Sequence, residues 1–154
     1  MQSVSVVPVQ IDTADAKALE GALRRVNGKA LINSVNGKRE SMDAVFPLVR
    51  RYGGVTVALC LDENGIPDTA DGRISVAKKI LAEGAKYGLS EEDFVFDALT
   101  LAVSADPDAA RTTLETVRRL NEELGVHTVL GVSNVSFGLP ERPALNNAMY
   151  TLAK

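Results

Sequence analysis

Carboxylate and carboxamide side chains stand at the ends of four apolar stretches of this sequence. Asp12 follows PVQI and Asn33 follows ALI, while Asp97 ends FVFD and Asn134 follows GVS. A polar side chain is costly to bury unless it has hydrogen-bond partners. The four positions include no lysine, histidine or serine–histidine pair, so they favour recognition by hydrogen bonds over nucleophilic attack.

The hydrogen-bonding capacity of these groups indicates the kind of ligand that they suit. A carboxylate can accept two parallel N–H bonds from a heterocycle that has an amino group next to a ring N–H. A carboxamide can donate and accept at once. The set therefore favours a ligand with the edge of a pterin or a purine.

Each of these side chains also has a structural interpretation. Asp12 could cap the helix that follows it, although other residues nearby could cap the same helix. Asn33 and Asn134 could satisfy the backbone of a turn, and Asp97 could have a purely structural role within its apolar run. Asp106 is interpreted as a helix cap and not as a ligand-binding residue.

Five apolar, β-branched runs alternate with helical patterns and must position these side chains. The expected strands are SVSVVPVQI (3–11), ALIN (30–33), VTVALCL (55–61), FVFDALTL (94–101) and TVLGVS (128–133). The expected helices cover about 14–26, 41–52, 71–87, 107–124 and 143–153. Ser41 and Asp106 are the expected N-caps of the second and fourth helices, and the third helix is expected to begin near Asp71. Pro107 and Pro143 stand at the expected first helical positions of the fourth and fifth helices.

The strand patterns predict an α/β fold with a parallel sheet. The runs are almost continuously apolar, as in parallel strands that are covered on both faces. Five βα units follow one another without a linker, so residues 1–154 are expected to form a single domain. Part of an eight-stranded barrel and an open doubly wound sheet both fit, and in both folds ligands bind at the carboxyl ends of the strands.

Composition and charge exclude several classes of function. The chain has 154 residues, of which 45% are hydrophobic, and its formal net charge is -3. No apolar run approaches the roughly 18 residues of a membrane span, and the N-terminus lacks the features of a signal peptide, so we expect a cytoplasmic protein. The lysines and arginines are not clustered, which argues against nucleic-acid binding.

Metal and phosphate chemistry are also disfavoured. Cys60 and His127 are the single cysteine and the single histidine, so no zinc site is expected. Cys60 is interpreted as a buried hydrophobic residue and His127 as a surface residue at the start of the last strand. The loop 62–73 lacks the spacing of a calcium loop, and no glycine-rich phosphate-binding motif occurs.

Four segments are distinctive enough to indicate a family: PVQIDT, ALINSVNG, FVFDALTLAVSADP and GVSNVSFGLPERPALN. They resemble the methyltetrahydrofolate-binding (pterin-binding) domain of cobalamin-dependent methionine synthase and the methyltetrahydrofolate:corrinoid methyltransferases, within the dihydropteroate synthase-like superfamily. The resemblance covers about residues 4–154. It implies a TIM barrel of eight βα units, of which about five are present here, matching the third to seventh strands.

A partial barrel implies a partner. An open arc of five strands leaves two sheet edges and apolar interior surface uncovered. We therefore expect association with a complementary chain or with a second copy. A further acidic residue that the resemblance places on the second strand is absent together with that strand.

The resemblance also implies a role for each candidate site residue. The pterin-binding residues would be Asp12, Asn33, Asp97, Asn134, Ser136 and Arg142. Asp97 would accept the 2-amino and N3–H groups of the pterin. Asn134 would act at N5, the methyl-bearing nitrogen, and is the expected catalytic residue. Arg142 would steady this site or the folate.

The implied reaction is transfer of the N5-methyl group of methyltetrahydrofolate to the cobalt of a corrinoid (cobalamin) on a partner domain or protein, as in methionine biosynthesis and one-carbon metabolism. One alternative is dihydropteroate synthase-like chemistry, although that family resembles G-x-S-R-K here and this chain has Asn134-Val135 in place of the basic residues. Another is a non-catalytic pterin-binding fragment that needs a partner chain.

Overall fold

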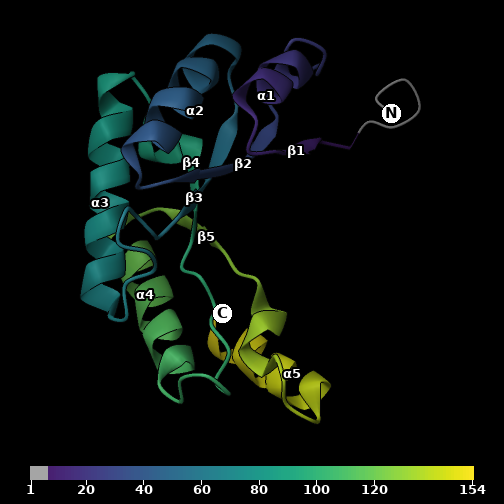
Figure 1. Ribbon diagram of the computed structural model, residues 1–154, viewed down its shortest axis with the longest axis vertical. Coiled ribbons are helices and arrows are strands. Elements are labelled where there is room, and N and C mark those ends of the chain that lie inside the picture. The colour runs from purple at the N-terminus through teal and green to yellow at the C-terminus, as the bar shows by residue number, and fades with distance from the viewer. Residues whose placement is uncertain (1–6) are drawn as a thin grey trace.

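The computed structural model describes residues 7–154, and within them five strands form one parallel sheet. The strands are β1 (Gln10–Asp12), β2 (Leu31–Asn36), β3 (Val55–Leu59), β4 (Phe94–Asp97) and β5 (His127–Val129). Each strand pairs with the next along the chain, so the order in the sheet is the order in the sequence (Figure 1).

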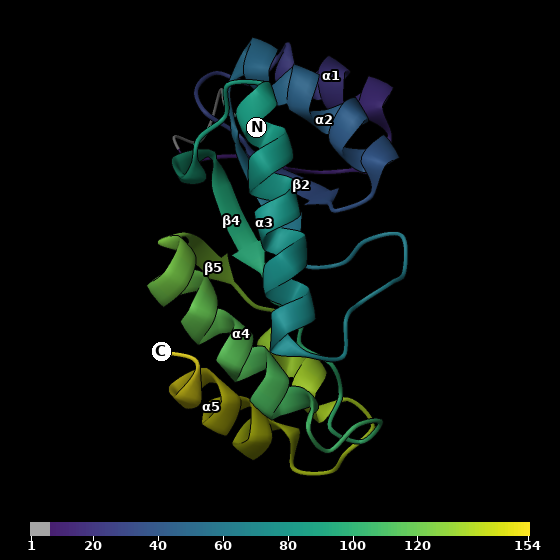
Figure 2. The ribbon, with the colours of Figure 1, turned by 90° about the vertical axis from the view of Figure 1, so that its left-hand side faces the viewer.

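Five α-helices connect or follow these strands. They are α1 (Ala16–Leu23), α2 (Arg39–Tyr52), α3 (Ala70–Lys86), α4 (Ala109–Leu124) and α5 (Arg142–Leu152). Short 3-10 helices precede β4 and follow β5, namely η1 (Glu91–Asp93) and η2 (Val132–Ser136). Figure 2 shows α3 in the middle, with α1 and α2 at one end and α4 and α5 at the other.

The strand order distinguishes between the two folds that the sequence allowed. A doubly wound sheet reverses its strand order at a switch point and carries helices on both faces. Here the order never reverses, and the helices follow one another along one side of a curved sheet (Figure 1). The fold is therefore an α/β arc of five consecutive units of a barrel-like architecture, as predicted.

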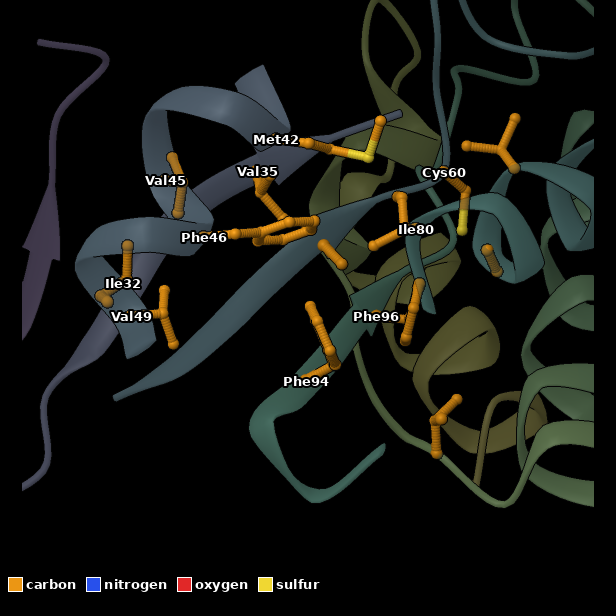
Figure 3. Packing of buried hydrophobic residues seen from close by; sticks show 14 of the residues in the cluster. Ile32, Val35, Met42, Val45, Phe46, Val49, Cys60, Ile80, Phe94 and Phe96 are labelled. Atoms are coloured by element: carbon orange, nitrogen blue, oxygen red, sulfur yellow. The ribbon is translucent and has the colours of Figure 1, made fainter. Parts of the chain in front are cut away.

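The main core lies between this sheet and its helices. Phe46 of α2 packs edge-on against Tyr87 and Phe94, with ring centroids 5.6 and 5.9 Å apart. Phe96 continues the cluster beside Phe94, and both rings are fully buried (Figure 3). Aromatic rings contribute large buried areas, so this cluster joins α2 and α3 to the middle strands.

The opposite face of the sheet is apolar but only partly covered. Paired residues on adjacent parallel strands point to the same side, so Leu31 and Val55 share this face, as do Leu59 and its partner Asp97. Leu31, Val55 and Leu59 are half-buried, whereas Val129 is 42% exposed. This face, called the concave face below, is not covered by any helix in the described part of the chain (Figure 1).

Three predicted strands extend too far towards their carboxyl ends. The run 128–133 is wrong beyond Val129, because Val132–Ser136 folds as η2. The run 94–101 ends at Asp97, and 55–61 ends at Leu59. The first run, 3–11, begins outside the described residues, and β2 continues past 33 to Asn36 after an irregularity in its pairing with β3.

Several predicted helix starts also differ. Ser41 is not a cap, because α2 begins at Arg39 and the Ser41 hydroxyl instead accepts the N–H of Asn36. Asp106 forms a turn by accepting the N–H of Asp108, and α4 begins only at Ala109. The third helix begins close to the predicted position, at Ala70, and Thr69 caps it. The fifth helix begins at Arg142, and α1 is shorter than 14–26.

Among the helices of residues 7–154, none combines the length and the apolar character needed to cross a bilayer.

The contacts of Phe46 in the aromatic cluster predict a large loss of stability when this side chain is removed. Truncation of Phe46 to alanine leaves a cavity against Tyr87 and Phe94, so we expect Phe46→Ala to lower the free energy of unfolding by about 3–5 kcal/mol in urea titrations. Tyr150→Ala is a control, since Tyr150 is 55% exposed and its loss should cost less than about 1 kcal/mol. Equal losses in the two variants would contradict this account of the core.

Candidate functional site

The predicted polar residues lie at the carboxyl ends of the strands and in the segments that follow. Asp12, the last residue of β1, pairs with Asn33 of β2, and the Asn33 amide Nδ2 donates to Asp12 Oδ2 at 3.1 Å. Both line a cavity of about 530 Å³, together with Asn36 and Ser41. These two predicted residues are therefore brought together at one end of the sheet.

The helix-capping alternative for Asp12 does not hold. Asp15 caps α1, because its Oδ1 accepts the N–H groups of Lys17 and Ala18 at 2.8 and 3.3 Å. Thr13 Oγ1 in turn accepts the N–H of Asp15. Asp12 is therefore left exposed at the end of β1, where its side chain contacts Asn33.

Asp97 is the last residue of β4 and is half-buried. Its Oδ1 accepts the N–H of Leu99 at 2.8 Å, and within the described residues its Oδ2 accepts no hydrogen bond. Burial raises the pKa of this carboxyl above its ordinary value, while the Leu99 N–H and the charge of Arg73 act in the opposite direction. One oxygen thus positions the carboxylate, and the other is available to a ligand.

Asn134 lies in η2 with an exposed side chain. Its backbone N–H donates to the Gly131 carbonyl at 3.1 Å, which closes the turn after β5. A Cβ atom at position 131 would come within 2.8 Å of Asn134 Nδ2. The glycine therefore leaves the space in which this carboxamide lies.

Ser136 and Arg142 are hydrogen-bonded to each other. The buried Ser136 hydroxyl donates to Asn146 Oδ1 at 2.7 Å and accepts from Arg142 Nε at 3.1 Å. Arg142 Nη2 also donates to the Ser133 carbonyl at 3.1 Å. These contacts tie the start of α5 to η2, so in this structure the two residues hold the segment that carries Asn134.

The segments that carry Asp97 and Asn134 are linked through the backbone. In the loop after β4, the Val103 N–H donates to the Val135 carbonyl at 3.0 Å. Nearby, the Ser104 hydroxyl donates to the Phe137 carbonyl at 2.8 Å. The loop 98–106 and η2 therefore form a second arm of the site, separate from the Asp12–Asn33 pair.

Strand register reveals one further polar residue on the same face. Asn36 of β2 pairs with Leu59, which pairs with Asp97, so Asn36 and Asp97 occupy one row across the sheet. They are two strand spacings apart, roughly 10 Å along the sheet. Asn36 lies beyond residue 33, where the strand was expected to end. The irregular pairing of β2 with β3 after Asn33 brings Asn36 opposite Leu59 and so into the row of Asp97.

Nucleophilic and metal chemistry have little support in the described residues. Cys60 is completely buried, and burial raises the pKa of its thiol to about 12, so the thiolate that would attack a substrate is disfavoured. No group of three or more His, Cys, Asp or Glu side chains in residues 7–154 is placed to hold a metal ion. Hydrogen-bond recognition is the chemistry that this site offers.

A larger cleft, of about 730 Å³, lies between α4 and the C-terminal residues 152–154. Its lining includes none of the predicted site residues. Charged residues of α4 form much of its wall, among them Arg111, Glu115 and Arg118. Volume alone does not select a candidate site, and the convergence of polar side chains favours the strand ends as the candidate.

Comparison with known proteins identifies the family. Residues 1–153 match the family model described as pterin binding enzyme. This chain belongs to the pterin-binding family. It is 30% identical over 146 residues to a methionine synthase of Mycobacterium tuberculosis, and 29% identical over 150 residues to that of Mycobacterium leprae.

A methylcorrinoid:tetrahydrofolate methyltransferase of Eubacterium limosum is 28% identical over 158 residues, an alignment that covers 99% of this chain and 58% of the relative. The matches to the two methionine synthases cover 88% and 90% of this chain but only 12% of each relative. The chain thus spans a part of each relative's length. Membership of the pterin-binding family agrees with the ligand edge that the site chemistry indicated.

The raised pKa of Asp97 predicts how this pterin-binding chain depends on pH. Its folded pKa lies above the unfolded value, so its contribution to stability is complete at acid pH and is lost as pH rises through the folded pKa. Asp97→Asn removes this loss and keeps an oxygen for the Leu99 N–H. We expect this variant to be more stable than the wild type at pH 7 and equally stable near pH 3, by urea unfolding.

Asp93→Asn is a matched control of opposite sign. The Ser90 N–H, with help from Lys29, lowers the pKa of Asp93, so its carboxylate stabilises the fold above the unfolded pKa and this contribution is lost in acid. The control should therefore be less stable than the wild type at pH 7. Destabilisation at pH 7 in both variants would contradict the assignment for Asp97.

Proposed function

We propose that this chain binds methyltetrahydrofolate at the carboxyl ends of its strands and takes part in methyl transfer between the folate N5 and a corrinoid. The observation that carries the proposal is the second arm, in which the Val135 and Phe137 carbonyls, next to Asn134 in the chain, accept hydrogen bonds from the loop that follows Asp97. Family membership and the similarity to a methionine synthase and to a methylcorrinoid:tetrahydrofolate methyltransferase support the same chemistry.

Asp97 is proposed to recognise the pterin edge. Its Oδ2 accepts no hydrogen bond within the described residues, and its Oδ1 retains accepting capacity beside the Leu99 N–H. A 2-amino group and the adjacent N3–H would donate to these two oxygens in parallel. A half-buried position strengthens such bonds, because less water competes for them.

The Asp12–Asn33 pair is proposed to bind the opposite edge of the pterin. One N–H of Asn33 Nδ2 donates to Asp12, while Asp12 is exposed and retains accepting capacity. Asn36 occupies the same row of the concave face as Asp97 and adds a third polar group. The chain therefore offers hydrogen-bonding groups on both sides of β3.

Asn134 is proposed to act at N5. When the N5–methyl bond breaks, the bonding electron pair stays on nitrogen, and a tertiary amine is a poor leaving group without a hydrogen bond or a proton. A carboxamide N–H directed at N5 would stabilise this developing charge in the transition state more than in the ground state. Gly131 leaves the space that this carboxamide needs.

The nucleophile is proposed to come from outside this chain. A reduced corrinoid bound to another domain or protein would supply the attacking cobalt. The described site residues agree with an external nucleophile, because carboxylates and carboxamides bind and orient a ligand by hydrogen bonds. The Cys60 thiol is buried and its pKa is raised, which disfavours its use as a nucleophile. This chain would then bind and orient the folate and stabilise charge at N5.

The alternatives predict different measurements. Dihydropteroate synthase-like chemistry needs basic residues for a pyrophosphate leaving group. In this chain Asn134 and Val135 occupy the positions at which that family resembles R-K, so these basic residues are missing. A non-catalytic pterin-binding fragment would bind methyltetrahydrofolate without turnover when reduced corrinoid is supplied. Neither alternative uses a hydrogen-bond donor at N5.

Two substitutions separate binding from chemistry. Asn134→Ala should lower the methyl-transfer rate at saturating folate by roughly 10²–10³, the usual cost of one transition-state donor. Asp97→Asn should weaken methyltetrahydrofolate binding by roughly 10-fold to 100-fold, as expected for lost bonds to a charged group. The measurements are calorimetric titration and single-turnover transfer to reduced corrinoid, with Asp106→Asn as the control.

Unchanged binding and unchanged rates in the two variants would overturn these roles. The control Asp106 is exposed and bonds only the nearby Asp108 N–H, so its amide should behave like the wild type. A loss of the same size in Asp106→Asn would point to a general effect of charge.

We also propose that the concave face is covered by a second copy or by a complementary chain. Leu31, Val55 and Leu59 of this face are half-buried and Val129 is exposed in the described structure, and such a surface favours association. Light scattering should give a mass above the 16.4 kDa of the chain, or a stoichiometric complex with a complementary chain. Val129→Asp should weaken this association, and Lys78→Asp on the exposed side of α3 should not; a well-folded wild-type monomer that binds no such chain would refute it.

A further inference from the structure

Arg73 of α3 is a buried charged residue beside the second arm. Its side chain is only 1% exposed and is among the largest fully buried side chains of the described residues. Nη1 donates to the carbonyls of Ala98 and Leu99 at 2.8 and 2.9 Å, and Nε donates to the Pro67 carbonyl at 2.9 Å. The guanidinium therefore holds the residues that directly follow Asp97.

A guanidinium in this position is unusual in energetic terms. A buried charge is costly unless it is paired, and within residues 7–154 no carboxylate forms an ion pair with Arg73. Carbonyl oxygens and Thr113 Oγ1, the latter at 3.3 Å, accept hydrogen bonds from its Nε and Nη1. The acidic groups whose charges act on it from nearby elements are Asp68, Asp97 and Asp106, together with the Cys60 thiol.

The contacts of Arg73 lead to Asp97 in two steps. Leu99 has a φ of 64°, which is uncommon for a residue with a branched side chain. In this conformation its carbonyl accepts from Arg73, while its N–H donates to Asp97 Oδ1. The Leu99 backbone thus connects the guanidinium to the carboxylate.

We propose that Arg73 is a positioning residue for Asp97, which it orients through the Leu99 backbone and keeps in the carboxylate form for ligand recognition. This inference rests on the proposed function, in which Asp97 binds the pterin. Arg73 touches no ligand in this scheme. Its charge also acts on Asp97 directly, since it opposes the rise in pKa that burial causes.

A purely structural role makes a different prediction. Arg73 also joins the loop before α3 to the loop after β4 and to α4, through Pro67, Ala98 and Thr113. If it only held these segments together, its loss would lower stability without a specific dependence on Asp97. The two roles therefore differ in their coupling to Asp97 and in the titration of that carboxyl.

The decisive experiment is a double-mutant cycle of Arg73→Met and Asp97→Asn, measured by calorimetric titration with methyltetrahydrofolate. Arg73→Met should weaken binding at least about tenfold in the wild-type background and much less in the Asp97→Asn background, because the carboxylate that it positions is already absent. Additive effects would overturn the inference. Arg73→Lys, which keeps the charge but not the fork, should retain part of the affinity and remains testable if Arg73→Met does not fold.

Titration of Asp97 provides a readout that needs no ligand. Carboxyl carbon NMR, assigned with Asp97→Asn, should show a higher Asp97 pKa in Arg73→Met and a value near the wild type in Arg73→Lys. The groups that face Asp97 in this titration are Arg73 from α3 and Cys60 after β3. An Asp97 titration unchanged by loss of the charge would overturn the inference.

A matched control addresses general damage to α3. Glu83 lies on the same helix, is 8% exposed and pairs with Lys86 and Arg39. Glu83→Gln should lower stability while leaving the Asp97 titration and folate binding unchanged, and an equal effect on binding would count against Arg73. If the wild type binds no methyltetrahydrofolate, the proposed function fails, and the Asp97 titration still decides whether Arg73 positions it.

Discussion

The parallel pairing of each strand with the next one along the chain is the constraint on which the remaining structure depends. Because the order in the sheet never reverses, every connecting helix returns on the same side, and every strand ends at the same edge. Residues as distant in sequence as Asp12 and Asp97 thereby reach one edge of one sheet. The helical face is closed by the Phe46 cluster, whereas the concave face stays open for other contacts.

Hydrophobic pattern was sufficient to predict the type and order of the elements but not their ends. An apolar run looks the same whether it continues as a strand or turns, and both 128–133 and 94–101 turn early. After β5, the segment Val132–Ser136 forms η2, and the Asn134 N–H donates to the Gly131 carbonyl. After β4, Leu99 adopts a positive φ, which is not expected for a leucine.

The candidate site shows the same division between what the sequence indicates and what it cannot. Residue type was enough to select Asp12, Asn33, Asp97 and Asn134, because a polar side chain at the end of an apolar run is costly to bury unless it has a hydrogen-bond partner. It could not show that Ser136 and Arg142 contact each other, since that pairing depends on how α5 packs on η2. The sequence indicates Asn36 as a polar residue after ALI, but it does not place Asn36 in the row of Asp97, because that row depends on an irregular register. Arg73 could not be selected, because a buried contact across elements leaves no local pattern.

The middle of the site is formed by apolar side chains, and this feature limits the ligand shapes that fit. Leu59 of β3 lies in the row between Asn36 and Asp97, and Val57 lies in the neighbouring row, between Asn33 and Val95. These side chains offer a surface without hydrogen bonds, and the polar groups stand at its two borders. A flat heterocycle with polar edges satisfies both conditions, because its face can cover β3 while its edges meet the carboxylates and carboxamides. A compact charged ligand would leave the apolar side chains of β3 exposed to water. An apolar ligand would bury Asp97 without a hydrogen-bond partner, which is costly in free energy. Both kinds of ligand are therefore disfavoured.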